Sequence, residues 1–388
     1  MASQMLHRSI ARDSANPCLG LGYGFFPDTG FFVWALNKFL GADTWFSTLP
    51  ARLAGPPNEI ARLADDPELV AEGFRWEKEY SYLFAAQPDS NLAVLFSRAT
   101  RDYYGQTHQD YTLDYHLTCS ALVDASIDFE VVTTIPKAGQ WPVLVLSSAI
   151  CLSEEEITCL ETYLQAGGIV VACGPTGLRD QRARLLQNPC LELHGIRMLV
   201  DEPERIPSFP PYIHQARLAA RCTGFLDEAR IEPADWVAVE IGAGRLYWSP
   251  GRAQLDAKEF NLAARIASIL PEKSPYVLKT PSGWALRRYK DSEHIYLVGL
   301  PKIVVSIPHD TISNAFMKES IVERIEYSPL DTESLIIQFE HSPTSIRVYS
   351  PDLSEPRESK WGGALADKTS TIDLSGICRF FVIQIKVA

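Results

Sequence analysis

Residues 153–173 read SEEEITCLETYLQAGGIVVAC, and this stretch decides the fold of the middle of the chain. Ser153 and the three glutamates after it predict a helix start, because serine caps free backbone N–H groups and acids suit the positive end of a helix. Apolar residues then recur at helical spacing as far as Leu164. Gly167-Gly168 ends the helix, and the apolar run Ile169–Ala172 has the length of a buried strand.

The same alternation of apolar runs and amphipathic helices extends to both sides of this stretch. Leu113–Ala125 is a second predicted helix, and 259–270 is a closing helix that Pro271 ends. Strands that are apolar throughout and alternate with helices indicate an open parallel sheet covered on both faces. The expected strands are 92–96, 129–133, 143–147 and 169–172, with a hairpin through Gly242 near 236–248.

The remaining segments are predicted to differ from this α/β region. Residues 179–235 are rich in proline and arginine, and we expect irregular loops there. After Pro271 short strand-like runs replace the helices, which indicates a β-sandwich. Before residue 90 we expect a glycine-rich loop at 20–30 and two helices, within 31–40 and 66–84. Two helices and a loop are too little for an independent enzyme and suggest the tail of something larger.

Composition excludes several classes of function. The 388 residues carry a formal net charge of -12, and lysine and arginine are scattered, so we expect no nucleic-acid partner. We expect no membrane partner either, because no apolar run is long enough to cross a bilayer, and we see no signal peptide before Asp13. The eight cysteines form no CxxC pair and are expected to be mostly buried thiols in a reducing cytoplasm. No spacing of His, Cys, Asp and Glu predicts a metal site, and no motif predicts a cofactor.

Four segments in order carry a resemblance to a known family. They are the strand that ends in Phe96-Ser97-Arg98, the run Val143–Leu146 with the serines after it, the stretch LETYLQAGGIVVA at 160–172, and GAGRLYWSP at 242–250. Together they resemble the trimerisation domain of β-galactosidases of glycoside hydrolase family 42. That domain is flavodoxin-like and related in fold to class I glutamine amidotransferases. Val348–Leu353, VYSPDL, is similar to the small β-domains that end such enzymes.

The resemblance implies three regions and a function. Residues 1–89 look like the end of a (β/α)8 barrel, 90–271 like the trimerisation domain, and 272–388 like the β-sandwich domain. A whole barrel needs about 250 residues, so the positions that would match the family's two catalytic glutamates are expected to be missing. We therefore expect a non-catalytic assembly and carbohydrate-associated part of such an enzyme. The alternative is a stand-alone α/β small-ligand-binding protein or an amidotransferase-like enzyme.

Candidate ligand-binding residues follow the predicted strands, because open parallel sheets bind ligands beyond the carboxyl ends of their strands. Hydroxyl, aromatic and guanidinium side chains of this kind hydrogen-bond to sugars or stack on them. Solvated loop residues and subunit contacts are the alternative reading. The candidates are Ser97, Arg98, Tyr103, Ser147, Ser148, Thr176 and Arg179.

An amidotransferase would need a reactive cysteine on a sharp turn after a strand. Cys151 and Cys173 follow predicted strands, but Cys151 has no flanking glycine, and Val171 and Pro175 occupy the positions where glycines would be expected around Cys173. Buried structural thiols are therefore the favoured reading of both residues, and we assign no catalytic residue.

The aromatic segment at 23–46 is the third candidate region. Tyr23, Trp34 and Trp45 would lie near a sugar-binding mouth if the segment ends a barrel, whereas core packing is the alternative. Eight aromatic residues between Phe25 and Phe46 are also too many for so short a segment to bury by itself. We therefore expect this surface to meet another chain, either a second copy in a homo-oligomer or a barrel-containing partner.

Overall fold

The computed structural model describes residues 1–22, 27–46, 52–53, 68–105, 110–201, 205–207, 214–216, 221–254, 260–271, 274–281, 283–302, 304–314, 318–327, 334–359 and 368–387. The chain divides into two compact units. The first, here called the α/β unit, contains residues 1–10 and 90–271, and the second, the β-rich unit, contains residues 11–89 and 272–388. The first ninety residues are thus shared between the two units.

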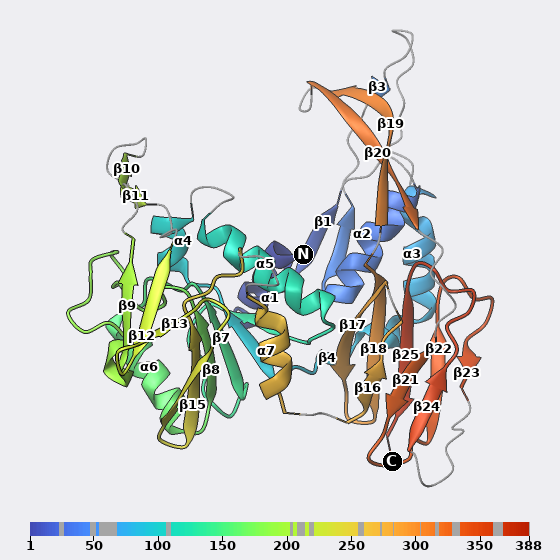
Figure 1. Ribbon diagram of the computed structural model, residues 1–388. Helices are drawn as coiled ribbons and strands as arrows, with labels where there is room; N and C mark the ends of the chain where they lie inside the picture. Colours follow the sequence, from blue (N-terminus) through green and yellow to red (C-terminus); the bar gives the residue numbers. More distant parts are fainter. Residues whose placement is uncertain are drawn as a thin grey trace. The chain divides into compact units, whose positions relative to one another are not determined.

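A six-stranded sheet forms the centre of the α/β unit, in the order β14-β15-β8-β7-β5-β6 (Figure 1). All neighbours in it are parallel except β14 and β15, which form the hairpin expected through Gly242. The strands expected here are confirmed. They are β5 (Leu92–Leu95), β6 (Glu130–Val132), β7 (Val143–Ser147), β8 (Ile169–Cys173), β14 (Val237–Ile241) and β15 (Gly244–Ser249).

Helices cover both faces of this sheet, which is why β7 is buried along its whole length. Figure 1 shows α6 on one side and α5 and α7 on the other, and α5 contacts α7. At the start of α6, Ser153 and Glu156 form a capping box, as the sequence predicts. The helices of the unit are α1 (Ala2–Asp13, which continues into the β-rich unit), α4 (Arg98–Tyr104), α5 (Tyr111–Asp124), α6 (Glu154–Gln165) and α7 (Leu262–Ile269).

The expectation of irregular structure over 179–235 is wrong in part. An antiparallel sheet β13-β12-β9 lies there, built from β9 (Ile196–Val200), β12 (Cys222–Leu226) and β13 (Ala229–Ile231). The short strands β10 (Arg205–Pro207) and β11 (His214–Ala216) pair with each other. A Cβ on Gly224 would lie 2.2 Å from the Trp248 ring, so this glycine lets β12 approach β15. In β9 apolar residues occupy exposed as well as buried positions over only five residues, which explains why the sequence pattern is weak.

The β-rich unit contains a second six-stranded sheet, in the order β23-β22-β25-β18-β17-β4, and it is antiparallel throughout. Apolar side chains of this sheet form one core with those of the three-stranded sheet β16-β21-β24. The strands are β4 (Gln87–Pro88), β16 (Tyr276–Lys279), β17 (Trp284–Lys290), β18 (His294–Pro301), β21 (Leu335–Gln338), β22 (Ser345–Tyr349), β23 (Arg357–Glu358), β24 (Thr369–Ile372) and β25 (Phe381–Lys386). A further hairpin joins β19 (Val304–Asn314) to β20 (Lys318–Tyr327), and β3 (Arg52–Leu53) pairs with β19.

An aromatic layer connects the helices of the β-rich unit to its sheet. It consists of Phe31 and Trp34 on α2 (Pro27–Leu40), Trp76 on α3 (Glu68–Glu79), Phe84 at the end of the short 3-10 helix Ser81–Phe84, and Phe380 just before β25. The Trp34 ring centroid lies 5.2 Å from that of Phe380 and 5.9 Å from that of Trp76. The Tyr289 hydroxyl on β17 also donates a hydrogen bond to the Phe39 carbonyl, at 2.9 Å.

The loop expected at 20–30 is also wrong where the structure describes it. Residues Leu19–Gly22 form β1, which pairs in parallel with β2 (Asp43–Phe46), and α2 already begins at Pro27. The glycines of β1 hide its pattern, because they are the positions that face α2. A Cβ on Gly20 would lie 1.9 Å from Asn37 Oδ1, and one on Gly22 would lie 2.1 Å from Val33 Cγ1.

Candidate functional site

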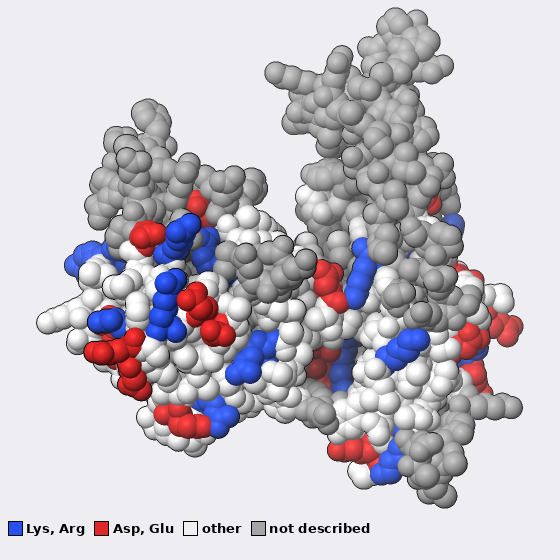
Figure 2. Space-filling view, in the orientation of Figure 1, with Lys and Arg blue, Asp and Glu red and all other residues white. Residues whose placement is uncertain are grey.

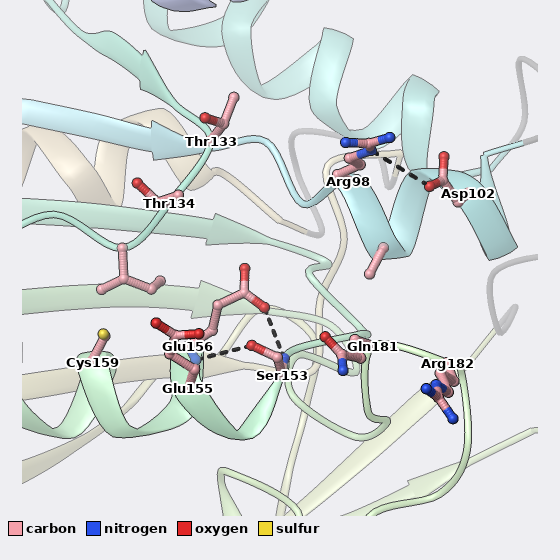
Figure 3. Close-up of a pocket in the computed structure, with 12 residues that line it drawn as sticks. Arg98, Asp102, Thr133, Thr134, Ser153, Glu155, Glu156, Cys159, Gln181 and Arg182 are labelled. Carbon is pink, nitrogen blue, oxygen red and sulfur yellow. Dashed lines mark hydrogen bonds and ion pairs between the residues drawn. The ribbon is translucent and has the colours of Figure 1, made fainter. Parts of the chain in front are cut away.

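A pocket of about 570 Å³ opens at the carboxyl ends of the parallel strands in the α/β unit (Figure 3). Its walls come from four segments, which follow β5, β6, β7 and β8 in the chain. The lining residues are Arg98, Ala99, Asp102, Thr133, Thr134, Ile135, Ser153, Glu155, Glu156, Cys159, Gln181 and Arg182. This edge is the one at which open α/β sheets bind ligands.

Strand order explains why a hollow forms here. The chain passes from β5 to β6 at one edge of the sheet, whereas β7, β8 and β15 follow on the other side of β5. The segments that leave β5 and β7 therefore diverge, and the crevice between them is the topological switch point of the sheet. α4 begins on one side of this crevice and α6 on the other.

Some charged side chains of the pocket are fixed by close contacts, and others are exposed. The Arg98 side chain is 83% exposed, and its Nε lies 3.9 Å from Asp102 Oδ2. Arg101 contacts the other carboxylate oxygen of Asp102 more closely, at 2.7 Å. On α6, the Ser153 N–H donates to Glu156 Oε2 at 2.8 Å, while the Glu156 N–H donates to Ser153 Oγ at 3.1 Å. Glu155, Gln181 and Arg182 are exposed around the same hollow (Figure 3).

Of the ten residues expected to bind a ligand, Arg98 is among those that line this pocket, and the eight others that the structure describes are not. Ser97 is buried and caps α4, and its hydroxyl donates to the Cys151 carbonyl at 3.0 Å. Tyr103 is half-buried on α4. Arg179 is half-buried too, and its Nη1 donates to the Ala183 carbonyl at 2.9 Å.

Three further candidates lie buried beneath the edge of the sheet. Ser147 Oγ is 2.7 Å from Thr118 Oγ1, and Thr176 Oγ1 donates to the Cys173 carbonyl at 2.7 Å. Ser148 has a left-handed φ of 51°, and its buried hydroxyl hydrogen-bonds to the Asp114 side chain, which opposes the rise in the pKa of Asp114. These hydroxyls belong to the core of the unit and do not face the pocket lining.

A buried ion pair lies at the same end of the sheet. Asp114 on α5 is fully buried and accepts hydrogen bonds from Arg252 Nε at 3.1 Å and from the Gln254 backbone N–H at 3.2 Å. Burial raises the pKa of Asp114, and the positive charge of Arg252 opposes that rise. The pair ties the segment after β15 to α5, and it is a structural contact.

The two cysteines that follow strands are poor nucleophiles in this structure. Cys151 and Cys173 are both fully buried, and burial raises the pKa of each thiol to about 12. Both thiols are therefore protonated at neutral pH, and a protonated thiol does not attack carbonyl carbon. All eight cysteines are free, and Cys159, which faces the pocket, is exposed.

The aromatic candidates Trp34 and Trp45 differ in their exposure to solvent. Trp34 is fully buried in the aromatic layer, where its Nε1 donates to Glu77 Oε2 at 2.8 Å. Trp45 is 59% exposed, and it shares one face of the β1–β2 pair with Leu19 and Leu21, which are 52% and 49% exposed. We call these three residues the open face of the pair. Tyr23 lies outside the described residues.

Sequence reasoning missed most of the pocket. Glu155 and Glu156 were explained by the helix start alone, and Gln181 and Arg182 lie in the segment expected to be irregular. The pocket could have been predicted from topology, because all four segments that line it follow parallel strands. Among the described residues, no group of three or more His, Cys, Asp or Glu is arranged to hold a metal ion, and no described helix is long and apolar enough to span a membrane.

Neither a protein-family model nor a curated protein sequence matches the chain. Solved glycosidases do match it in fold. An α-L-fucosidase from Paenibacillus thiaminolyticus has a TM-score of 0.63 at 16% identity over 99% of this chain and 62% of its own. A β-galactosidase from Bacillus circulans sp. alkalophilus has a TM-score of 0.59 at 12% identity, over 99% of this chain and 58% of its own. A GH42 β-galactosidase from G. stearothermophilus has a TM-score of 0.56 at 13% identity, over 93% of this chain and 51% of its own.

The chain therefore spans between about half and three fifths of the length of the solved proteins it matches. At such low identity the likeness concerns the fold. It confirms the resemblance to part of a family 42 β-galactosidase at that level, with a mixed α/β architecture that combines a largely parallel sheet and antiparallel sheets.

Proposed function

We propose that the chain is a non-catalytic assembly and carbohydrate-associated portion of a β-galactosidase-like glycoside hydrolase. The observation that carries this proposal is the unequal coverage of the fold match. Nearly all of this chain matches the solved glycosidases, while 38–49% of each of those chains has no counterpart here. The described parallel strands form one open six-stranded sheet and the β1–β2 pair, and no closed barrel occurs among the described residues.

We also propose a finer description of the two units. The five parallel strands of the α/β unit, numbered in chain order, lie in the sequence 2-1-3-4-5, which is the flavodoxin-like order. In the β-rich unit the shared core of the six-stranded and three-stranded sheets supports a β-sandwich. Both descriptions agree with the family that the sequence resembles.

The β1–β2 pair supports a barrel-containing partner. Its strands are parallel and joined by α2, which covers only the face that carries Gly20 and Gly22. Parallel sheets are normally covered on both faces, and two strands alone are marginal in water. The open face of Leu19, Leu21 and Trp45 is therefore suited to contact further strands, supplied by a partner or by another copy in a homo-oligomer.

Sedimentation and an activity assay test this proposal. We expect the purified chain to form species heavier than its own 43.3 kDa at micromolar concentration and not to hydrolyse aryl galactosides. Leu21→Lys should weaken the association, whereas Leu278→Lys, at an exposed leucine on β16, should leave it unchanged. Hydrolysis by the pure chain would contradict the non-catalytic role. A clean monomer with residues 20–46 protected from protease would contradict the assembly role.

The pocket of the α/β unit favours a second candidate, a small-ligand-binding protein. Its position at the switch point of the sheet is the observation that supports this reading. The amidotransferase version gains no such support, because the thiols of Cys151 and Cys173 are buried and protonated. Binding of a small ligand by a chain that neither associates nor turns over glycosides would favour this candidate over the first.

A further inference from the structure

We propose that the pocket at the switch point of the α/β unit is a binding site for a neutral mono- or disaccharide, which its described residues hold by hydrogen bonds. This inference rests on the proposed carbohydrate-associated function and names the residues that would serve it. The volume of about 570 Å³ falls in the range of small-molecule sites, roughly 300–1,000 Å³.

The first step excludes anionic ligands such as phosphates and nucleotides. The α6 N-terminus that faces the pocket carries Glu154, Glu155 and Glu156 in its first turn. These carboxylates occupy the positive end of the helix and repel a second anion. The Glu156 N–H, which an anion would otherwise use, already donates to Ser153 Oγ. On this wall a phosphate would therefore meet three carboxylates, and the serine cap already uses the Glu156 N–H.

The second step concerns the balance of donors and acceptors. Arg98 and Arg182 donate hydrogen bonds only, and Glu155 accepts only, while the hydroxyls of Thr133 and Thr134 do both. Figure 3 shows these groups around one hollow, with Arg98 on α4 and Glu155 on α6 on opposite sides. A sugar presents hydroxyls that both donate and accept, so one ring can satisfy both kinds of wall at once.

The third step concerns net charge and strength of binding. The lining holds two arginines and three carboxylates, and Arg101 already neutralises Asp102 from outside the lining, so the remaining charges balance. A balanced set favours a neutral ligand over a charged one. None of the described lining residues is aromatic, so these residues offer a sugar hydrogen bonds and no ring on which to stack. We therefore expect a dissociation constant in the millimolar range.

Protection of Cys159 offers a direct readout. This exposed thiol lines the pocket, so a bound sugar should slow its alkylation by iodoacetamide. With lactose at saturating concentration we expect the full chain to react at Cys159 at least about threefold more slowly. Cys18, a half-buried thiol in the β-rich unit, is the internal control and should react at an unchanged rate.

Variants and competing ligands make the test decisive. Arg98→Ala and Arg182→Ala should each abolish the protection by lactose, and both side chains are exposed, so folding should be unaffected. Arg230→Ala, which removes an exposed arginine on β13 of the same unit, should leave the protection intact. Phosphate and glutamine should protect less than lactose. The proposal is overturned if lactose fails to protect, if either competitor protects better, or if the Arg98 variant keeps its protection.

Failure of this inference is distinguishable from failure of the proposed function. A chain that associates and lacks hydrolase activity, but whose Cys159 lactose does not protect, overturns the pocket assignment alone. A chain that hydrolyses aryl galactosides overturns the non-catalytic role, whatever the pocket binds.

Discussion

The aromatic layer of the β-rich unit and the carboxyl edge of the parallel sheet both gather side chains that proteins use to hold sugars, but their environments are opposite. Trp34 is enclosed by Phe31, Trp76, Phe84 and Phe380. Its indole N–H is already bonded to Glu77. At the sheet edge, charged side chains of both signs stay accessible, and Figure 2 shows blue and red residues interspersed on the visible face. A side chain suited to a ligand becomes a site only where its neighbours leave it unsatisfied.

The largest expected effect in a test of this comparison comes from removing the Trp34 ring. Trp34→Ala should lower the free energy of unfolding by about 3–5 kcal/mol, because it empties a fully buried ring site. Trp45→Ala is the matched control and should change that of the unassociated chain by less than about 0.5 kcal/mol, since the ring is mostly exposed there. Chemical denaturation measures both. Equal losses would show that Trp45 is also part of the core.

The buried ion pair beneath the pocket offers the second test. Arg252→Gln should cost about 3 kcal/mol at neutral pH, because it leaves the buried carboxylate of Asp114 without its counter-charge. Burial already raises the pKa of Asp114 in the folded state. The folded chain therefore binds this proton more tightly than the unfolded chain, and stability falls as pH rises through the raised pKa.

The cost of Arg252→Gln should accordingly shrink as the pH is lowered towards the pKa of an unfolded aspartate, about 3.9. Asp114→Asn with Arg252→Gln should remove this pH dependence. Denaturation at neutral and mildly acidic pH measures it. A cost that stays constant with pH would mean that Asp114 keeps its proton, or its charge, through the whole range.

Thiol reactivity separates the two environments within one unit. In the native chain Cys159 should react with a maleimide at least about tenfold faster than Cys151 or Cys173. Burial raises the pKa of the Cys151 and Cys173 thiols and also keeps the reagent away from them. Mass spectrometry after short labelling measures the rates, with Cys159→Ser as the control. Fast native labelling of Cys173 would reopen the question of a reactive thiol at the strand end.

The smallest expected effect is a gain in stability at Ser148. Ser148→Gly should stabilise the chain by about 0.5 kcal/mol relative to Ser148→Ala, because glycine adopts the left-handed φ of 51° without strain, although it is freer when unfolded. Ser148→Ala keeps that strain and serves as the control. Thermal unfolding of the pair isolates the backbone contribution, and an alanine variant more stable than the glycine variant would argue against strain at this position.

The sequence predicted the parallel sheet well and the site poorly, for one physical reason. Strands such as Val143–Ser147 are apolar throughout because both faces are covered, and that pattern is local in sequence. The pocket joins residues from four segments between Arg98 and Arg182, so it depends on strand order, which local patterns do not encode. Arg98 was found because it directly follows a strand. Glu155 was not, because a helix start explains it equally well.

The division of the chain into units has a consequence for biosynthesis. The β-rich unit is discontinuous, since the whole α/β segment 90–271 lies between its two parts. α2 and α3 are synthesised before the α/β segment, whereas Phe380, which packs against Trp34, is synthesised after it. The α/β unit can complete its sheet before Phe380 is available to pack against the rings of Trp34 and Trp76. A nascent chain paused near residue 300 would therefore expose these rings to chaperones.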